Sequence, residues 1–419
     1  MDPAIRARNK KAMFAIPCLL RGGTEQQTLL LVKVLIESGY KVAVCCYFEY
    51  DEQMVDEFKA AGADILLLKW SRDIGAIKFI CKLSALFRAK SPDIVHVQYI
   101  APGFLPIIAA KLARVPVLLA TVHYPGTPHG FTAHLFLRVG ALLADCFTCV
   151  SEAAEKSWFG NSFLLNPSNS INLTASKHLT IPNAVDIVSI DKAITDKSPN
   201  ILETARRLEY KTVIGTIARL SNEKGVDVLL QTFAVVCAKL PNVHLLIVGD
   251  GKQKDYLLKL AAELRISDSC TWMGRLPWNE AMSSLSLMDI VVVPSRFEGF
   301  GLTAIEAMAC KKPVVASHVD GLAEIIRDGH NGFLVPSEDI KSFADCIVAL
   351  AKDVVKRKSI GEAARKCVEE KYAYPIFRER VRALYEAVGK PRTEGGDQRT
   401  EDGSRGTEAG SQRSANGRE

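Results

Sequence analysis

The sequence contains no apolar run of about 20 residues, the length needed to cross a bilayer. The strongest candidate, residues 104–122, is interrupted by Lys111 and Arg114. The first 20 residues resemble a short strand before a Gly-Gly turn rather than a signal peptide. With 48% hydrophobic and 24% charged residues, the composition is typical of a soluble globular protein. We expect a cytoplasmic protein that is not secreted.

The spacing typical of disulfide frameworks and metal sites is also missing. The eleven cysteines are scattered through apolar segments, which favours a reducing compartment. Cys146 and Cys149 form a CxxC pair, but in a strand their sulfur atoms would point to opposite faces, and no second pair accompanies them. An Asp-x-Asp pair, which could hold a divalent metal on a pyrophosphate, occurs nowhere in the chain. We expect no metal and no cofactor.

The net charge of +6 is small for 419 residues, and no dense Lys/Arg block or aromatic-basic stripe is present. Nucleic acid is therefore not an expected partner. A mild positive charge favours anionic ligands or an anionic membrane surface.

Short apolar segments alternate with amphipathic ones in two successive series, a pattern typical of α/β domains with parallel sheets. We expect an acceptor-side Rossmann-like domain over residues 1–187, a second Rossmann-like domain over 188–375, and a cleft between them. A hinge is expected within 187–210, and a final helix over 376–389 after the break that Pro375 imposes. Residues 390–419 are rich in Gly, Ser and charge and predict a disordered tail. The predicted strands lie within KAMFAIPCL, KVAVCCYF, ADILLL, DIVHVQ, PVLLATVH, CFTCVS, TVIGTIARL, VHLLIVGDG, CTWMGRL, DIVVVPS and PVVASHV.

The stretch EGFGLTAIE, residues 298–306, follows the predicted buried strand DIVVVPS. Gly299 and Gly301 allow the backbone to approach a ligand, and a helix is expected to start near Leu302. In open parallel sheets, ligands bind at the carboxyl ends of strands, where helix N-termini attract anions. Alternatively, each of Glu298 and Glu306, taken alone, could simply favour the helix dipole.

Two further predicted turns between a strand and a helix carry glycines or cations. Gly22 and Gly23 follow the first strand in RGGTEQQ, but without the G-x-G-x-x-G pattern of nicotinamide or flavin sites. In ARLSNEKG, Arg219 and Lys224 follow a strand of the second series and suit a pyrophosphate, although a lone loop cation is more often simply solvated. Cations for phosphates and carboxylates for sugar hydroxyls together predict a nucleotide-sugar site. His123 ends a strand of the first series and would face this site from the other domain, although a single histidine at a strand end is more often structural than catalytic.

These segments resemble the retaining GT-B glycosyltransferases of family 4. The resemblance extends from about residue 11 to about residue 388, and its most specific element is the Glu-x7-Glu signature formed by Glu298 and Glu306. The motifs that carry it are RGGTE, TVH at 121–123, IPNAVD, ARLSNEKG, LLIVGDG and EGFGLTAIEAMACKKPVVAS.

The resemblance implies a UDP- or GDP-sugar donor held mainly by the second domain, a saccharide or lipid-linked acceptor on the first, and metal-independent transfer. The role implied for Glu298 is to contact the transferred sugar, while Glu306 would contact the ribose and Arg219 with Lys224 the diphosphate. His123 would lie beside the reacting sugar. The remaining implied substrate-binding residues are Gly22, Gly23, Gly274, Arg275, Leu276, Gly299, Phe300, Gly301 and Leu302.

The chain departs from the family pattern at two positions. Ala218 replaces a usual Gly before Arg219, and Asp320 replaces the first of a Gly-Gly pair, which leaves the donor identity open. Two other functions remain as alternatives: a GT-B nucleotide-sugar epimerase, and a non-catalytic nucleotide-sugar-binding protein.

The acceptor cannot be identified from the residues, and cell-surface polysaccharide or glycolipid synthesis is expected only by analogy with bacterial relatives. Residues 74–90 predict a basic amphipathic helix. It could lie on the anionic inner face of the cell membrane, but a surface helix packed on the core with its lysines outward is the favoured alternative.

Overall fold

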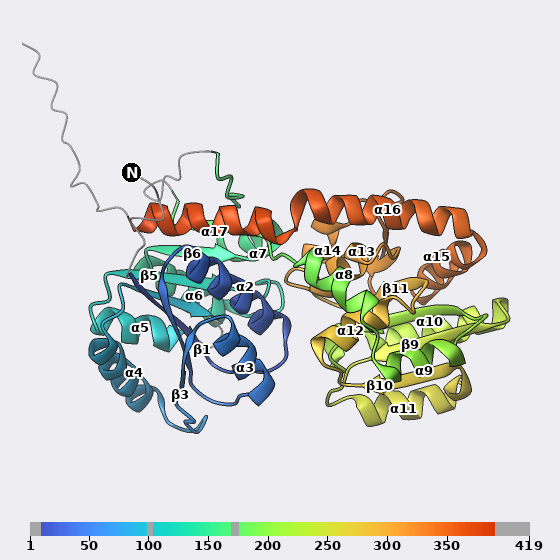
Figure 1. The fold of residues 1–419 in the computed structure, drawn as a ribbon, viewed down its shortest axis with the longest axis horizontal. Helices are drawn as coiled ribbons and strands as arrows, with labels where there is room; N and C mark the ends of the chain where they lie inside the picture. The colour runs from blue at the N-terminus through green and yellow to red at the C-terminus, as the bar shows by residue number, and fades with distance from the viewer. Residues whose placement is uncertain (1–9, 99–103, 169–175, 390–419) are drawn as a thin grey trace, which may run out of the picture.

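The computed structural model describes residues 10–98, 104–168 and 176–389. It contains two parallel sheets, each covered by helices on both faces (Figure 1). The expected tail over 390–419 lies outside the described residues.

The first sheet has seven parallel strands in the order β3-β2-β1-β4-β5-β6-β7. Helices α2, α3 and α17 cover one face and share a core with strand residues such as Phe14 and Val44. Helices α4 to α7 cover the other face, where Val97 and Leu118 are buried. The strands are β1 (Lys11–Ile16), β2 (Lys41–Cys46), β3 (Asp64–Leu67), β4 (Ile94–Gln98), β5 (Val117–Val122), β6 (Cys146–Cys149) and β7 (His178–Thr180). The helices are α2 (Gly23–Glu37), α3 (Glu52–Ala60), α4 (Ala76–Lys90), α5 (Phe104–Leu112), α6 (Phe131–Leu143) and α7 (Glu152–Phe159).

The second sheet has six parallel strands in the order β10-β9-β8-β11-β12-β13. All four residues of β11, Ile290–Val293, are buried, as expected for a β-branched strand covered on both faces. The strands are β8 (Thr212–Ile217), β9 (Val243–Val248), β10 (Cys270–Gly274), β11 (Ile290–Val293), β12 (Val314–Ser317) and β13 (Phe333–Val335). The helices are α8 (Ile187–Thr195), α9 (Pro199–Arg207), α10 (Val226–Lys239), α11 (Lys254–Glu263), α12 (Trp278–Leu285), α13 (Leu302–Ala309), α14 (Asp320–Ile325), α15 (Ile340–Lys352) and α16 (Val354–Lys371).

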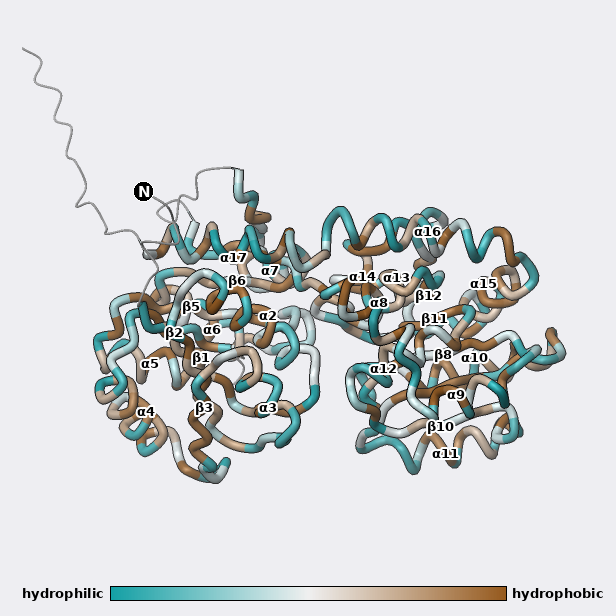
Figure 2. Tube along the Cα trace, viewed as in Figure 1, coloured by the Kyte–Doolittle hydropathy of each residue, from teal (hydrophilic) through white to brown (hydrophobic). Residues whose placement is uncertain are grey.

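The fold predicted from the sequence, an α/β architecture with two Rossmann-like parallel-sheet domains, is confirmed. All eleven expected strands are present, and the structure adds two, β7 and β13. Each has only three residues. The segment 187–210 forms α8 and α9, and Ile190 and Ala193 of α8 belong to a core of the second domain. Figure 2 shows hydrophobic residues concentrated along the strands and hydrophilic ones on the outer turns of α11 and α16.

The basic amphipathic helix expected over 74–90 is α4, and its apolar side is not free. Phe79, Leu83 and Phe87 are buried in the first domain, while Lys78 and Lys82 are exposed. This helix is therefore the core-packed surface helix that the sequence analysis favoured. Among the described residues, no helix is both long enough and apolar enough to cross a membrane.

The last helix, α17 (Tyr374–Val388), carries Pro375 in its first turn, where a missing N–H costs least. It follows α16 but packs against α2 of the first domain (Figure 1). Its buried residues Phe377, Val381, Leu384 and Tyr385 belong to the core that contains Phe14. The Tyr385 hydroxyl also hydrogen-bonds His96 Nδ1 over 2.7 Å. The chain thus returns to the first domain after completing the second.

The packing of α17 predicts that Leu384→Ala will destabilise the first domain. Leu384 is 1% exposed, so truncation should lower the free energy of unfolding by about 2–5 kcal/mol. The exposed Glu386 on the same helix provides a control, and Glu386→Ala should change it by less than about 0.5 kcal/mol. Urea denaturation of both variants checks this, and equal transitions would contradict the docking of α17.

Candidate functional site

The predicted phosphate cations and the Glu298 loop follow strands at the point where the second sheet reverses its strand order. In the second sheet, β8 and β11 are neighbours, while the chain proceeds outward from them in opposite directions. Arg219 and Lys224 follow β8, and Glu298 follows β11. In sheets of this kind, the crevice beyond these strand ends is the usual ligand site.

Lys224 and Glu298 form the central contact of this region. Lys224 lies in the short 3₁₀ turn Asn222–Lys224, and its Nζ atom is 2.6 Å from Glu298 Oε2. The Ser295 hydroxyl donates to the same carboxylate oxygen over 3.2 Å. The two side chains are 25% and 15% exposed, so the pair is partly shielded from water. The structure therefore brings together the predicted phosphate cation and the predicted sugar carboxylate.

Arg219 points toward the first domain. Its guanidinium hydrogen-bonds Glu223, with Nη2 2.8 Å from Oε1, and also contacts the Tyr124 side chain. Burial acts to lower the pKa of Arg219, but these two partners outweigh it and raise the pKa above its usual value. Tyr124 directly follows His123, so this contact joins the two halves of the site.

The glycines of the Glu298 loop allow the two domains to approach closely. Gly301 lies directly before α13 and has a φ of 112°. Residues other than glycine rarely adopt this backbone conformation. A Cβ atom on Gly299 would lie 2.1 Å from the His123 carbonyl oxygen, and the Ser151 hydroxyl donates to the Gly299 carbonyl over 2.6 Å. Phe300 is buried in the second domain against Tyr372. Any larger residue at 299 would separate the domains.

The glycine turn of the first domain meets the same loop. A Cβ atom on Gly23 would lie 2.6 Å from Leu302 Cδ1, so Gly23 and Leu302 are in contact across the interface. Gly22 packs on Glu25 instead, since its Cβ atom would lie 2.6 Å from Glu25 Oε2. Glu25 is 2% exposed, and burial raises its pKa.

His123 is 9% exposed, and its Nε2 atom lies 2.8 Å from Gln98 Oε1. Since that oxygen can only accept, Nε2 carries the proton. Burial lowers the His123 pKa to about 3, which keeps the ring neutral near pH 7. Gln98 thus holds the ring in its neutral form.

Glu306 lies one turn inside α13 and is partly buried. Burial raises its pKa to about 7, although a hydrogen bond from the Trp278 side chain opposes this shift. Trp278 begins α12, directly after the loop containing Gly274, Arg275 and Leu276. Gly274 has a φ of 65°. The structure thus connects Glu306 to the loop expected to contact the base.

Asp320, which in the sequence is a departure from the family's Gly-Gly pair, lies beside Glu298 in the structure. Its Oδ2 atom lies 3.4 Å from the Glu298 backbone nitrogen, and its carboxylate also hydrogen-bonds Thr127 of the first domain. Burial raises the Asp320 pKa, and the nearby Glu298 charge adds to this effect. The carboxylate is therefore already engaged by two donors.

Glu324 is an interdomain contact residue that the sequence motifs did not indicate. Its carboxylate accepts from the backbone N–H groups of Glu152 and Ala153 at the start of α7, with 3.0 Å to Glu152 N. This contact clamps the second domain to a helix N-terminus of the first. No local sequence signal could reveal it, because the two segments are about 170 residues apart.

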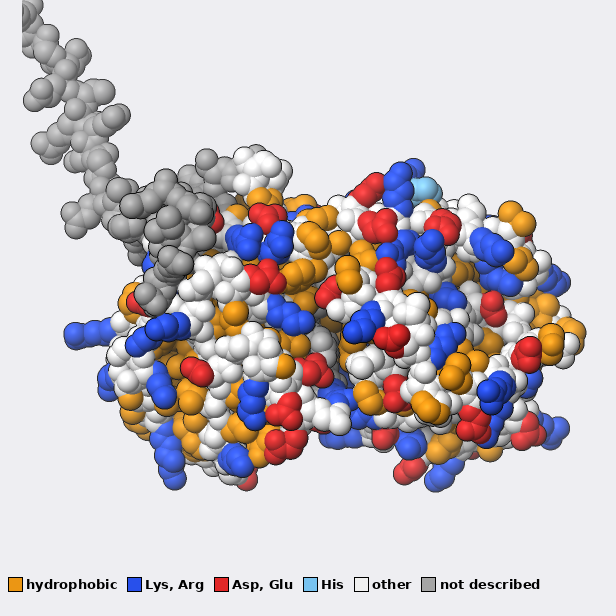
Figure 3. All heavy atoms as spheres, in the orientation of Figure 1, with side chains coloured by type: hydrophobic (Ala, Val, Ile, Leu, Met, Phe, Trp, Pro, Cys, Tyr) orange, Lys and Arg blue, Asp and Glu red, His pale blue; other side chains and the backbone are white. Residues whose placement is uncertain are grey.

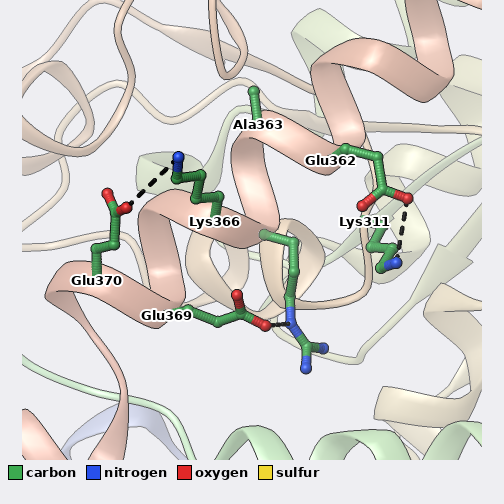
Figure 4. A pocket seen from close by; sticks show the side chains of 7 residues that line it. Lys311, Glu362, Ala363, Lys366, Glu369 and Glu370 are labelled. Atoms are coloured by element: carbon green, nitrogen blue, oxygen red, sulfur yellow. Dashed lines mark hydrogen bonds and ion pairs between the residues drawn. The ribbon is translucent and has the colours of Figure 1, made fainter.

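The hollow shown in Figure 4 is not a candidate active site. It lies on the outer side of α16, and its charges are already paired: Lys311 with Glu362 at 3.1 Å and Arg365 with Glu369 at 2.7 Å. Within residues 10–98, 104–168 and 176–389, no group of three or more His, Cys, Asp or Glu residues could hold a metal ion. Cys146 and Cys149 are free thiols in cores on opposite faces of the first sheet.

Two family models match the chain. The model described as glycosyl transferases group 1 matches residues 199–367, and the model described as Glycosyltransferase Family 4 matches residues 21–160. Together with the two parallel sheets and the site at their strand ends, these matches define a GT-B glycosyltransferase. The chain belongs to the group 1 glycosyltransferases, as the sequence motifs indicated.

Two relatives show the range of this family. A capsular polysaccharide biosynthesis glycosyltransferase of Staphylococcus aureus is 26% identical over 332 residues, which cover 76% of this chain and 84% of the relative. A GDP-mannose-dependent monoacylated alpha-(1-6)-phosphatidylinositol monomannoside mannosyltransferase of Corynebacterium glutamicum is 27% identical over 320 residues, with 73% and 79% covered.

A solved structure supports the fold. HepE of Anabaena, crystallised with UDP and glucose, superposes with a TM-score of 0.73 at 21% sequence identity. The superposition covers 88% of this chain and 97% of HepE.

The environment of Glu306 predicts that its carboxyl group titrates near pH 7. Carboxyl carbon NMR of glutamate-labelled protein should show a resonance that titrates near pH 7 and that Glu306→Gln removes. Trp278→Phe deletes the donor that favours the ionised form, so it should raise the Glu306 pKa further. A Glu306 resonance that titrates near 4 would show that burial does not control this group.

Proposed function

We propose that this glycosyltransferase uses a UDP- or GDP-sugar and transfers the sugar to a saccharide or lipid-linked acceptor with retention of configuration. The observation that carries the proposal is the 2.6 Å contact between Lys224 and Glu298 beyond the ends of β8 and β11. In this proposal, Lys224 would be the phosphate-binding cation and Glu298 the acceptor for sugar hydroxyls.

The diphosphate would be held by cations rather than by a metal. Lys224 would give up its ion pair with Glu298 and bind a phosphate oxygen instead. Arg219 would contribute a second positive charge from the same loop. The backbone N–H groups at Gly301 and Leu302, where α13 begins, would add donors to the anion. These groups would stabilise the negative charge that grows on the departing diphosphate, usually the largest catalytic contribution.

The two signature carboxylates would contact different parts of the donor. Glu298, released from Lys224, would accept hydroxyls of the sugar that becomes cationic during transfer. Glu306 would accept ribose hydroxyls, which favours its ionised form and would lower its raised pKa. Arg275 and Leu276, beside Trp278, would contact the base.

The first domain would supply the acceptor side. His123 would lie beside the reacting sugar as a neutral residue, and Gly23 would approach the donor from the opposite direction. The residues implied by the family resemblance include no enzymic nucleophile on the face of the sugar opposite the leaving group. We therefore infer front-face attack, in which the acceptor hydroxyl passes its proton to the departing phosphate.

The donor and acceptor classes rest on the named relatives. HepE was crystallised with UDP and glucose, and the Corynebacterium relative is described as GDP-mannose-dependent and acts on a phosphatidylinositol mannoside. The Staphylococcus relative is named for capsular polysaccharide biosynthesis. We accordingly place this enzyme in cell-surface polysaccharide or glycolipid synthesis, at the cytoplasmic face of the membrane.

The proposal predicts that Glu298→Gln and Glu306→Gln fail in different ways. Glu306→Gln should weaken the binding of UDP or GDP by about tenfold, because a charge-assisted hydrogen bond to ribose is lost. Glu298→Gln should leave this affinity undiminished, because a bare nucleoside diphosphate has no sugar, yet lower the turnover number about 100-fold.

Calorimetric titration of both variants, with Glu263→Gln on the exposed side of α11 as a control, measures these affinities. If the two signature variants bound the nucleotide equally, both roles would be wrong.

A further inference from the structure

Helix α6 of the first domain carries an apolar side that no other described element covers. Only Leu137 and Gly140 of its thirteen residues are buried. Five large apolar side chains are exposed, from Phe131 at 81% down to Val139 at 37%; the others are Leu135, Phe136 and Leu142. Ordinary surface helices of soluble proteins expose polar residues instead.

In the helical layer that contains α6, every charged residue on the helices α4, α5 and α6 is basic. Helices α4, α5 and α6 pack side by side on one face of the first sheet. They contain no Asp or Glu residue, although the whole chain has 47 of them. Their exposed cations are Lys78, Lys82, Arg88, Lys90, Lys111 and Arg138. By contrast, Figure 3 shows acidic and basic side chains interspersed on the face that carries α17 and α16.

Apolar exposure is also concentrated in this layer. Seven of the seventeen exposed large hydrophobic residues among the described ones belong to α4, α5 and α6, including Ile77 at 81% and Leu112 at 53%. Apolar side chains amid cations, with no acidic residue on the three helices themselves, suit a surface with a hydrocarbon interior and negative head groups. They do not suit a second copy of the same face, because its cations would repel one another.

We propose that the outer face of α4, α5 and α6, with the apolar side of α6 along one edge, docks the protein on an anionic lipid bilayer. The loop after His123 leads directly into Phe131, so the docked helix would begin beside the acceptor side of the active site. This role rests on the proposed membrane-associated acceptor, but docking itself requires no catalysis. The contact would also involve the exposed lysines of α4 and the exposed Ile77, whereas Phe79, Leu83 and Phe87 of this helix are buried in the core.

Vesicle co-sedimentation tests the proposal. The full chain should bind vesicles of equimolar phosphatidylcholine and phosphatidylglycerol, bind pure phosphatidylcholine much more weakly, and dissociate as salt is raised. The double variant Phe131→Gln/Leu142→Gln should bind the anionic vesicles at least about tenfold more weakly, since it removes two insertable side chains. Lys78→Gln/Arg138→Gln should reduce both the binding and its salt dependence.

The matched control is Val188→Gln/Val355→Gln, which alters side chains 78% and 80% exposed in the second domain and should bind vesicles as the wild type does. Equal vesicle binding by the α6 variant and this control would overturn the proposal. So would a wild-type dimer that the α6 variant converts to a monomer while vesicle binding is absent.

Calorimetric titration of UDP and GDP separates docking from the proposed function. A nucleotide affinity unchanged in the α6 variant, together with lost vesicle binding, would support docking. Vesicle binding without affinity for either nucleotide would contradict the proposed donor and leave docking supported.

Discussion

The site depends on the ion pair between Lys224 and Glu298. A lysine and a carboxylate 2.6 Å apart satisfy each other while partly shielded from water, so neither is left as an uncompensated buried charge in the free enzyme. Under the proposed function, a donor molecule would provide both groups with new partners, a phosphate for the lysine and hydroxyls for the glutamate. The pair would then separate only when the substrate replaces both interactions.

The second requirement is close contact between the domains. Gly23 meets Leu302 and Gly299 meets the His123 carbonyl, while the Glu324 carboxylate caps α7 across the same interface. Helix α17 adds a covalent and packed connection between the domains. Loops from both sheets thus meet at one interface, although each sheet folds around its own cores.

The sequence predicted most of this architecture, because buried parallel strands appear as short β-branched runs such as Ile290–Val293. Strands β7 and β13 escaped notice because three residues carry too little periodicity. The proximity of Lys224 and Glu298 was predictable, since parallel strands end at a common edge. The contacts of Arg219 with Tyr124 and of Asp320 with Thr127 were not, because they depend on how two separately folded domains meet. The apolar side of α6 was hidden for a similar reason, as hydropathy alone does not show which side of a helix its neighbours cover.

The most direct test measures nucleoside diphosphate released from a panel of UDP- and GDP-sugars in the presence of EDTA. The account predicts that the wild-type enzyme releases the diphosphate from at least one donor despite the chelator. It also predicts that Lys224→Met lowers this rate by about 100-fold or more while the protein remains folded. Equal rates in the two proteins, or release that requires added manganese, would contradict the claim that Lys224 holds the leaving group.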